Sequence, residues 1–151
     1  MDLPELSGPS VQVNQTGDWS LPEALLEAGV LAVLAKGGIS RGEISLTFLG
    51  DEEIQALNLE YLGKDRATDV IAFALHDPGA PPMGDVYVGY EQAGRQAKEL
   101  RVELEEELLR LAIHGTLHVL GHEHPEGEER SASEMYLLQE EILVEVLGAG
   151  R

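Results

Sequence analysis

The chain has 151 residues, with 10 basic and 28 acidic side chains and a formal net charge of −18. This length suits one folded domain, and a hydrophobic content of 43% suffices for a core without disulfides or a folding metal. Cysteine is absent, which excludes disulfide scaffolds, thiolate nucleophiles, iron–sulfur clusters and cysteine-based zinc fingers. Any metal must therefore be held by histidine and carboxylate.

Charge and hydropathy also restrict the partners of the protein. A net charge of −18 opposes broad binding to nucleic acid or anionic membranes, because Lys and Arg drive phosphate binding by displacing counterions. No stretch approaches the roughly 18 apolar residues of a membrane span, and the first residues lack the features of a secretory signal. We therefore expect a cytoplasmic protein with no membrane partner.

The first half of the chain predicts two strands, each followed by a helix. Residues 1–10 are expected to be loose, and alternating valines over 11–13 indicate a short strand. A helix is predicted over 20–36, where Ser and Glu three residues apart at its start have the spacing of a capping box. Residues 43–49 alternate as a half-buried strand, and a helix is predicted over 51–63.

The second half predicts two more strands and then helices. Residues 68–75 contain a continuous apolar run and are expected to form a central strand. A proline-rich loop over 76–83 leads to a strand at 85–90, which is expected to pair antiparallel with the preceding one. Three predicted helices follow, at about 91–101, 103–120 and 131–147. This order predicts an α+β fold, a small mixed β-sheet packed against several helices, as a single domain over 1–151.

Four of the five histidines fall within eleven consecutive residues. His114 and His118 are four residues apart in a helical pattern, so their imidazoles share one face about 6 Å apart along the axis. On a continuing helix His122 would lie about 12 Å from His114 along the axis, which is too far for both to bind one ion through bonds of about 2.1 Å. Gly121 is expected to end the helix and let the chain fold back, which makes His124 the better third ligand.

This spacing is that of the metzincin motif H-E-x-x-H-x-x-G-x-x-H with one difference. The motif's general base would be residue 115, and because Gly115 stands there, ordinary peptidase chemistry loses its base. Three neutral nitrogen ligands leave one position open to water, which is typical of a catalytic zinc site. We therefore predict one Zn²⁺ held by His114, His118 and His124, with water on the metal as the attacking group. Nickel, iron or copper would also suit three imidazoles.

Other side chains have weaker assignments. His122 is a candidate to support the metal ligands or face the substrate, and the alternative is that it binds the metal itself. Glu123 is a candidate for supporting the metal site or for proton transfer, and otherwise belongs to a solvated acidic turn. His76, alone in the proline-rich loop, is expected to be a solvated loop residue. The acidic stretch 103–107 is expected to begin a helix, where negative charge suits the helix dipole.

Two separated motifs resemble those of a known family. Residues 114–124 resemble the H-G-x-L-H-L-x-G-Y-D-H signature of the YbeY family of metal-dependent bacterial endoribonucleases and rRNA maturation factors. Residues 57–73 are similar to the family's L-N-x-x-Y-R-G-K-D-x-x-T-D-V-L-S-F segment, and 84–86 and 139–143 resemble later family segments. The resemblance covers most of residues 44–147.

The resemblance implies a function that spacing alone does not. It implies a compact α+β fold, zinc held by the three histidines, and single-strand-specific RNA cleavage in rRNA maturation and ribosome quality control. The implied partners are rRNA and the ribosomal small subunit, with ribosome-associated proteins as further candidates. A net charge of −18 then predicts weak, strongly salt-sensitive binding of free RNA, with ribosome context or protein partners supplying affinity.

The sequence departs from the family pattern at three positions. The family's Arg after its Tyr is Leu62 here, its Tyr before the acid is His122, and its Asp is Glu123. Loss of the Arg removes a side chain suited to phosphate recognition, which Arg66 in the following loop is a candidate to replace.

Five polar side chains are the candidates for substrate contact: Lys64, Arg66, Asn58, Thr68 and Asp69. The first two would contact phosphate near the ion, whereas Thr68 and Asp69 would otherwise serve a turn and a strand start. The first hypothesis is therefore a zinc-dependent endoribonuclease. The alternative is a ribosome-associated assembly factor with a mainly structural metal and little nuclease activity, and Gly115 disfavours the third option, a metallopeptidase.

Overall fold

The computed structural model of the protein describes residues 8–122 and 129–149. Within these ranges the sheet has four strands: β1 (Ser10–Gln15), β2 (Glu43–Leu49), β3 (Val70–Ala74) and β4 (Met83–Gly89). The spatial order is β1-β2-β4-β3, in which β1, β2 and β4 are parallel and β3 is antiparallel to β4. The expected antiparallel pairing of the last two strands is confirmed.

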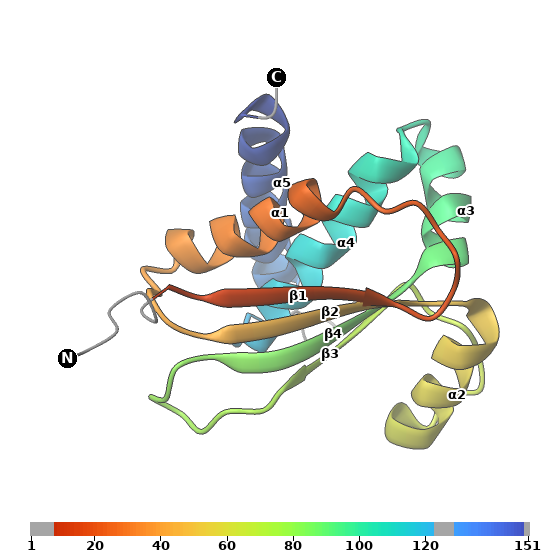
Figure 1. Ribbon diagram of the computed structural model, residues 1–151, viewed down its shortest axis with the longest axis horizontal. Helices are drawn as coiled ribbons and strands as arrows, with labels where there is room; N and C mark the ends of the chain where they lie inside the picture. Colours follow the sequence, from red (N-terminus) through yellow and green to blue (C-terminus); the bar gives the residue numbers. More distant parts are fainter. Residues whose placement is uncertain (1–7, 123–128, 150–151) are drawn as a thin grey trace.

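Helices cover both faces of this sheet, and the described ranges contain α1 (Glu23–Lys36), α2 (Asp51–Leu62), α3 (Tyr90–Leu100), α4 (Leu104–Val119) and α5 (Glu129–Ala149). Figure 1 shows α1 and α4 across one face, with α5 behind them and α2 on the opposite side. The predicted α+β fold with a small mixed sheet in a single domain is therefore confirmed.

The main core lies between the sheet and α4. Alternating residues of β2 and β4, among them Phe48 and Val86, are fully buried against Leu109 and Ile113 of α4. Because α4 contacts α1, α3, α5, β3 and β4, it is buried on most of its surface. The helix that carries two of the predicted ligands is thus the best-supported element of the fold.

The expectation that 68–75 forms a central strand is wrong, since β3 lies at an edge of the sheet. Both faces of β3 are nevertheless covered, which explains its continuous apolar sequence. Val70 and Ala72 pack against the main core. Ile71 belongs to a second cluster with Ile54 of α2, and Phe73 packs against that cluster from the same face.

Glycines end two helices where the sequence predicts it. Gly63 caps α2 with φ 72°, and Gly121 follows α4 with φ 99°, both in the left-handed region that glycine adopts without strain. The predicted capping box at the start of α1 is wrong. Pro22 occupies the N-cap without a side-chain hydrogen bond, and its carbonyl accepts the N–H of Leu26 at 3.0 Å.

The chain begins its sheet early and its last helix is longer than expected. β1 starts at Ser10, the last residue of the segment predicted to be loose. α5 extends the helix predicted over 131–147 at both ends, while the predicted break at 125–127 lies outside the described residues. In the two described ranges, no helix has both the length and the apolar character needed to cross a membrane.

Candidate metal centre

One face of α4 carries a polar stripe in an otherwise buried helix. From 107 to 119 every residue is buried except three, which are spaced four apart: Arg110, His114 and His118. Residues at this spacing lie one above the other on a helix. The two predicted ligands and an arginine therefore share one line of side chains along α4.

The imidazoles of His114 and His118 converge on one point. Their Nε2 atoms are 3.1 Å apart, and the ring centroids are 4.7 Å apart with the planes inclined by 74°. Two ligands of a tetrahedral ion with Zn–N bonds of about 2.1 Å lie about 3.4 Å from each other. The spacing of the two Nε2 atoms therefore suits shared coordination of a single ion.

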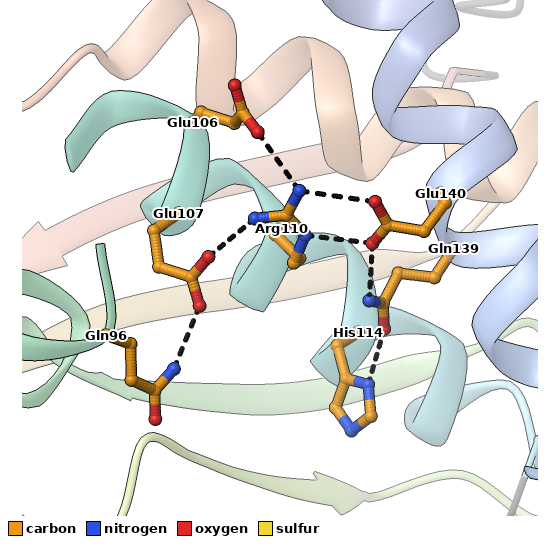
Figure 2. Close-up of polar contacts among 7 residues, drawn as sticks. All are labelled: Gln96, Glu106, Glu107, Arg110, His114, Gln139 and Glu140. Carbon is orange, nitrogen blue, oxygen red and sulfur yellow. Dashed lines mark hydrogen bonds and ion pairs between the residues drawn. The ribbon is translucent and has the colours of Figure 1, made fainter. Parts of the chain in front are cut away.

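The other nitrogen of His114 contacts α5. His114 Nδ1 lies 2.7 Å from Oε1 of Gln139, whose side chain is 6% exposed. The amide nitrogen of Gln139 donates to Oε2 of Glu140 at 2.9 Å (Figure 2). A hydrogen bond of this kind to the far nitrogen is the usual means by which proteins orient a metal-binding histidine.

Arg110 forms a cluster of ion pairs one turn away from His114. Its guanidinium pairs with Glu107 at 2.6 Å, Glu140 at 2.8 Å and Glu106 at 3.0 Å. Glu107 is 2% exposed and also accepts the Nε2 amide hydrogen of Gln96 at 2.8 Å. Figure 2 shows these contacts as one connected network between α3, α4 and α5.

This network changes the protonation equilibria of two members. Burial disfavours the charged form of Arg110, but hydrogen bonds to Glu140 and Glu107 outweigh it and raise the pKa of the guanidinium. Burial also acts to raise the pKa of Glu140, yet hydrogen bonds from Arg110 and Gln139 lower it overall. Glu140 is therefore ionised at neutral pH and acts only as a hydrogen-bond acceptor.

Gly115 faces the sheet. A Cβ at this position would lie 2.4 Å from Cγ1 of Val86 and 3.1 Å from Cγ2 of Val70. The residue that would be the general base in a metzincin therefore has neither a side chain nor space for one between α4 and the sheet. This is the steric reason for the glycine in the motif.

The remaining residues of the predicted ligand set are only partly described. His124 and Glu123 lie outside the described residues, so the third ligand stays a prediction. His122 is exposed, and its backbone N–H donates to the carbonyl of Leu117 at 3.0 Å, which turns the chain after α4. No group of three or more metal-binding side chains occurs within 8–122 and 129–149.

The loop between α2 and β3 carries the predicted phosphate contacts. Lys64 and Arg66 are exposed. Asn58 is 2% exposed, and its amide donates to the carbonyl of Arg66 at 2.9 Å, so it holds the loop from within. The carbonyl of Asp69 accepts the N–H of Gly89 at 2.8 Å and joins the loop to β4.

The end of this loop lies beside α4, because that helix packs on β3. Thr68 and Asp69 are half-buried, with the Thr68 hydroxyl 3.5 Å from Oδ1 of Asp69. Val70, which follows directly, packs beside Gly115, the neighbour of His114. The structure thereby places the strand start next to the helix that carries the stripe.

Two further positions differ from simple expectation. His76 is half-buried rather than solvated, because its Nδ1 accepts the N–H of Met83 at 3.1 Å and pins the β3–β4 loop. Leu62, where the related family has Arg, is 52% exposed at the end of α2. An exposed leucine there contributes no charge to the surrounding surface.

Sequence reasoning missed the network behind His114. It assigned the acidic stretch 103–107 only to a helix start, which is confirmed because Glu103 is the N-cap of α4. The spacing of Glu106 and Glu107 before Arg110 is a signal for ion pairs that was present in the sequence. The contact from Gln139 had no such signal, since it joins residues 25 positions apart.

Comparisons with known proteins agree on one family. A family model described as Endoribonuclease YbeY matches residues 13–147. The Endoribonuclease YbeY of Chelativorans sp. (strain BNC1) is 37% identical over 151 residues, covering 92% of this chain and 91% of its own length. That of Lysinibacillus sphaericus (strain C3-41) is 42% identical, covering 72% and 74% respectively. A solution structure from Thermotoga maritima matches with TM-score 0.66 and 30% identity over 93% of this chain and 91% of its own.

Proposed function

Because this chain belongs to the Endoribonuclease YbeY family, we propose that it is a zinc-dependent, single-strand-specific endoribonuclease that acts in rRNA maturation and ribosome quality control. Its proposed substrate is rRNA in the context of the small ribosomal subunit, and its proposed location is the cytoplasm. Family membership supports the endoribonuclease activity. The metal, the RNA class and the cellular role are the parts of the proposal that need experiment.

The observation that carries the metal proposal is the convergence of His114 and His118. Their Nε2 atoms are 3.1 Å apart, and the far nitrogen of His114 is held by Gln139. His124 is the proposed third ligand, which would leave one position of the ion open. A Zn²⁺ bound there would supply Lewis-acid charge and activate water for attack on a phosphodiester.

Residues of the protein would position the RNA around that centre. Lys64 and Arg66 are exposed cations on a loop anchored by Asn58, and they are the proposed phosphate contacts. Thr68 and Asp69 lie between that loop and β3 and are proposed to line the path to the histidines. His122 and Glu123 remain the proposed candidates for proton transfer.

The central experiment compares metal-loaded wild type with His114→Ala on single-stranded rRNA fragments and on a casein-like protein. We expect wild type to cleave RNA only with metal, and His114→Ala to lose both cleavage and stoichiometric zinc. His76→Ala is the matched control, because it removes a histidine from the β3–β4 loop. RNA cleavage that persists after complete metal removal would refute the proposal, and metal-dependent proteolysis would favour a peptidase.

The loop proposal has its own test. Lys64→Ala and Arg66→Ala should each weaken RNA binding, whereas Lys98→Ala removes an equally exposed cation from α3 and should not. Unchanged binding and cleavage in Arg66→Ala would exclude Arg66 as the replacement for the family arginine.

Leu62 keeps a second candidate function open. An exposed leucine replaces a side chain suited to transition-state charge, so a ribosome assembly factor with a mainly structural metal is the alternative. Zinc-loaded protein that binds small subunits but cleaves none of the RNA fragments would favour it. Leu62→Arg would then be expected to raise cleavage.

A further inference from the structure

We propose that Gln139 is a positioning residue that holds His114 as the tautomer with its proton on Nδ1, so that the Nε2 lone pair faces His118. The orientation of Gln139 is in turn imposed by Arg110 through Glu140. This inference rests on the proposed function in one respect, namely that a metal ion binds to the lone pair of His114 Nε2.

The argument begins at Arg110, which can only donate hydrogen bonds. Its Nε and Nη2 atoms lie 2.8 and 3.2 Å from the two oxygens of Glu140. The ionised carboxylate can only accept, so the atom of Gln139 that lies 2.9 Å from Glu140 must be the amide nitrogen. The amide oxygen of Gln139 is therefore the atom directed toward α4 (Figure 2).

The same logic continues to His114. The Gln139 oxygen can only accept, so His114 Nδ1, 2.7 Å away, must carry the hydrogen. A neutral imidazole has one N–H, so Nε2 of His114 carries a lone pair and no hydrogen.

The opposite arrangement is penalised by burial. A flipped Gln139 amide would bring its oxygen against the carboxylate of Glu140 and its NH₂ against His114. Two acceptors would then face each other at a residue that is only 6% exposed, where water cannot easily satisfy either of them. Ion pairs with Glu106 and Glu107 hold the guanidinium of Arg110 in place. The carboxylate of Glu140 is therefore held in place by Arg110.

The experiment measures the tautomer and the metal affinity separately. The imidazole ¹⁵N shifts of His114 are recorded in metal-free protein at about pH 8, where an ordinary histidine is neutral. Zinc affinity is measured by competition with a chromophoric chelator. Gln139→Leu, similar in size but without an acceptor, should convert the single Nδ1–H form into a mixture and weaken zinc binding about 10- to 100-fold.

Gln96→Leu is the matched control. Gln96 also donates its amide to a glutamate of the Arg110 cluster, at 2.8 Å from Glu107, but it has no contact with His114. This variant should retain both the wild-type tautomer and the zinc affinity.

Glu140→Gln tests whether Arg110 and Glu140 impose the orientation of Gln139, and it replaces no side chain that contacts His114 directly. A carboxamide at 140 can donate as well as accept, so the orientation of Gln139 is no longer imposed and His114 should become a tautomer mixture. A pure Nδ1–H form in this variant would overturn the role assigned to Arg110 and Glu140. A wild-type tautomer and zinc affinity in Gln139→Leu would overturn the inference as a whole.

These outcomes are separable from failure of the proposed function. The tautomer is measured without RNA, so a protein that cleaves no RNA but shows the predicted shift in Gln139→Leu keeps this inference and loses the nuclease proposal. Metal-dependent RNA cleavage by the wild type, together with an unchanged tautomer and zinc affinity in Gln139→Leu, would keep the nuclease proposal and refute this inference.

Discussion

Gly115 determines two properties of the site. It allows α4 to approach the sheet, because a Cβ there would meet Val86 at 2.4 Å, and it removes the carboxylate that a metzincin would use. α4 consequently packs closely against Val86 of β4 and Val70 of β3 at this point. This one residue therefore excludes the general base of a metzincin and sets how closely α4, which carries the two histidines, packs against the sheet.

We predict that Gly115→Ala destabilises the protein. Overpacking a well-filled core typically costs about 1–3 kcal/mol, which should exceed the gain of about 1 kcal/mol that alanine brings to a helix. Urea unfolding of the two proteins measures the difference. Gly94→Ala in α3 is the control, since a Cβ there meets nothing within 4 Å, and it should be stabilising by about 0.5–1 kcal/mol. Equal effects of the two substitutions would contradict the packing argument.

At the scale of elements, Arg110 joins α4 to α5. Its guanidinium bridges Glu106 and Glu107 on its own helix and Glu140 on the other, with 16% of its side chain exposed. The surface pair of Arg95 with Asp51 also joins two helices, but both side chains are far more exposed. Buried carboxylates depend strongly on their partner, whereas exposed pairs contribute little.

We therefore predict that Arg110→Met lowers the free energy of unfolding by about 2–3 kcal/mol. This is less than the roughly 3–5 kcal/mol for a fully buried pair because the Arg110 side chain keeps some contact with solvent. Chemical denaturation with urea is the measurement, and Arg95→Met is the control that should change little. A loss no larger than that of the control would mean that Glu107 and Glu140 do not need the guanidinium.

Glu140 makes part of this stability dependent on pH. Its pKa is lowered in the folded state, so its contribution is complete above the ordinary carboxyl pKa and is lost as the pH falls through the folded-state value. Glu140→Gln should therefore be less stable than wild type at pH 7, with a difference that shrinks below about pH 4. Unfolding midpoints across that range measure it.

Glu141→Gln is the matched control for this experiment. Glu141 pairs with Lys36 at 2.8 Å on the surface of the same helix and is 55% exposed. Its replacement should leave the stability of the protein nearly unchanged at each pH. A Glu140→Gln difference that grows on acidification would show that the sign of the argument is wrong.

At the scale of the molecule, the net charge and the proposed RNA-binding loop act on phosphate in opposite directions. A net charge of −18 repels a phosphate backbone, while Lys64 and Arg66 offer two exposed cations on one loop. Under the proposed function, attraction is confined to this loop, and free RNA should bind weakly.

We predict that this weak binding decreases with salt in proportion to the few phosphates contacted. Two contacts correspond to a slope of about −1.4 in a double-logarithmic plot, or about a sevenfold loss between roughly 50 and 200 mM salt. Fluorescence anisotropy with a labelled single strand measures the slope, which should fall by about 0.7 in Lys64→Ala. Tight binding that barely responds to salt would contradict the prediction.

Much of the fold follows from local sequence patterns. The strands over 43–49 and 83–89 alternate between buried and less buried residues, and glycines end α2 and α4 where the pattern stops. The shared face of His114 and His118 follows from helix geometry alone. The predicted central position of β3 is wrong, because a continuous apolar run indicates that both faces of a strand are covered. It does not indicate whether both edges of the strand are paired.

The sequence by itself determined the class of fold, the histidine stripe and the family, because each depends on residues close together in the chain or on motifs in a set order. Only the tertiary structure decided which side chain orients His114 and what occupies the space around Gly115. Gln139 and Val86 are 25 and 29 positions from their partners, and their contacts exist only after α5 and β4 have packed on α4. A hydrogen bond's direction, and hence a tautomer, is a property of that packing.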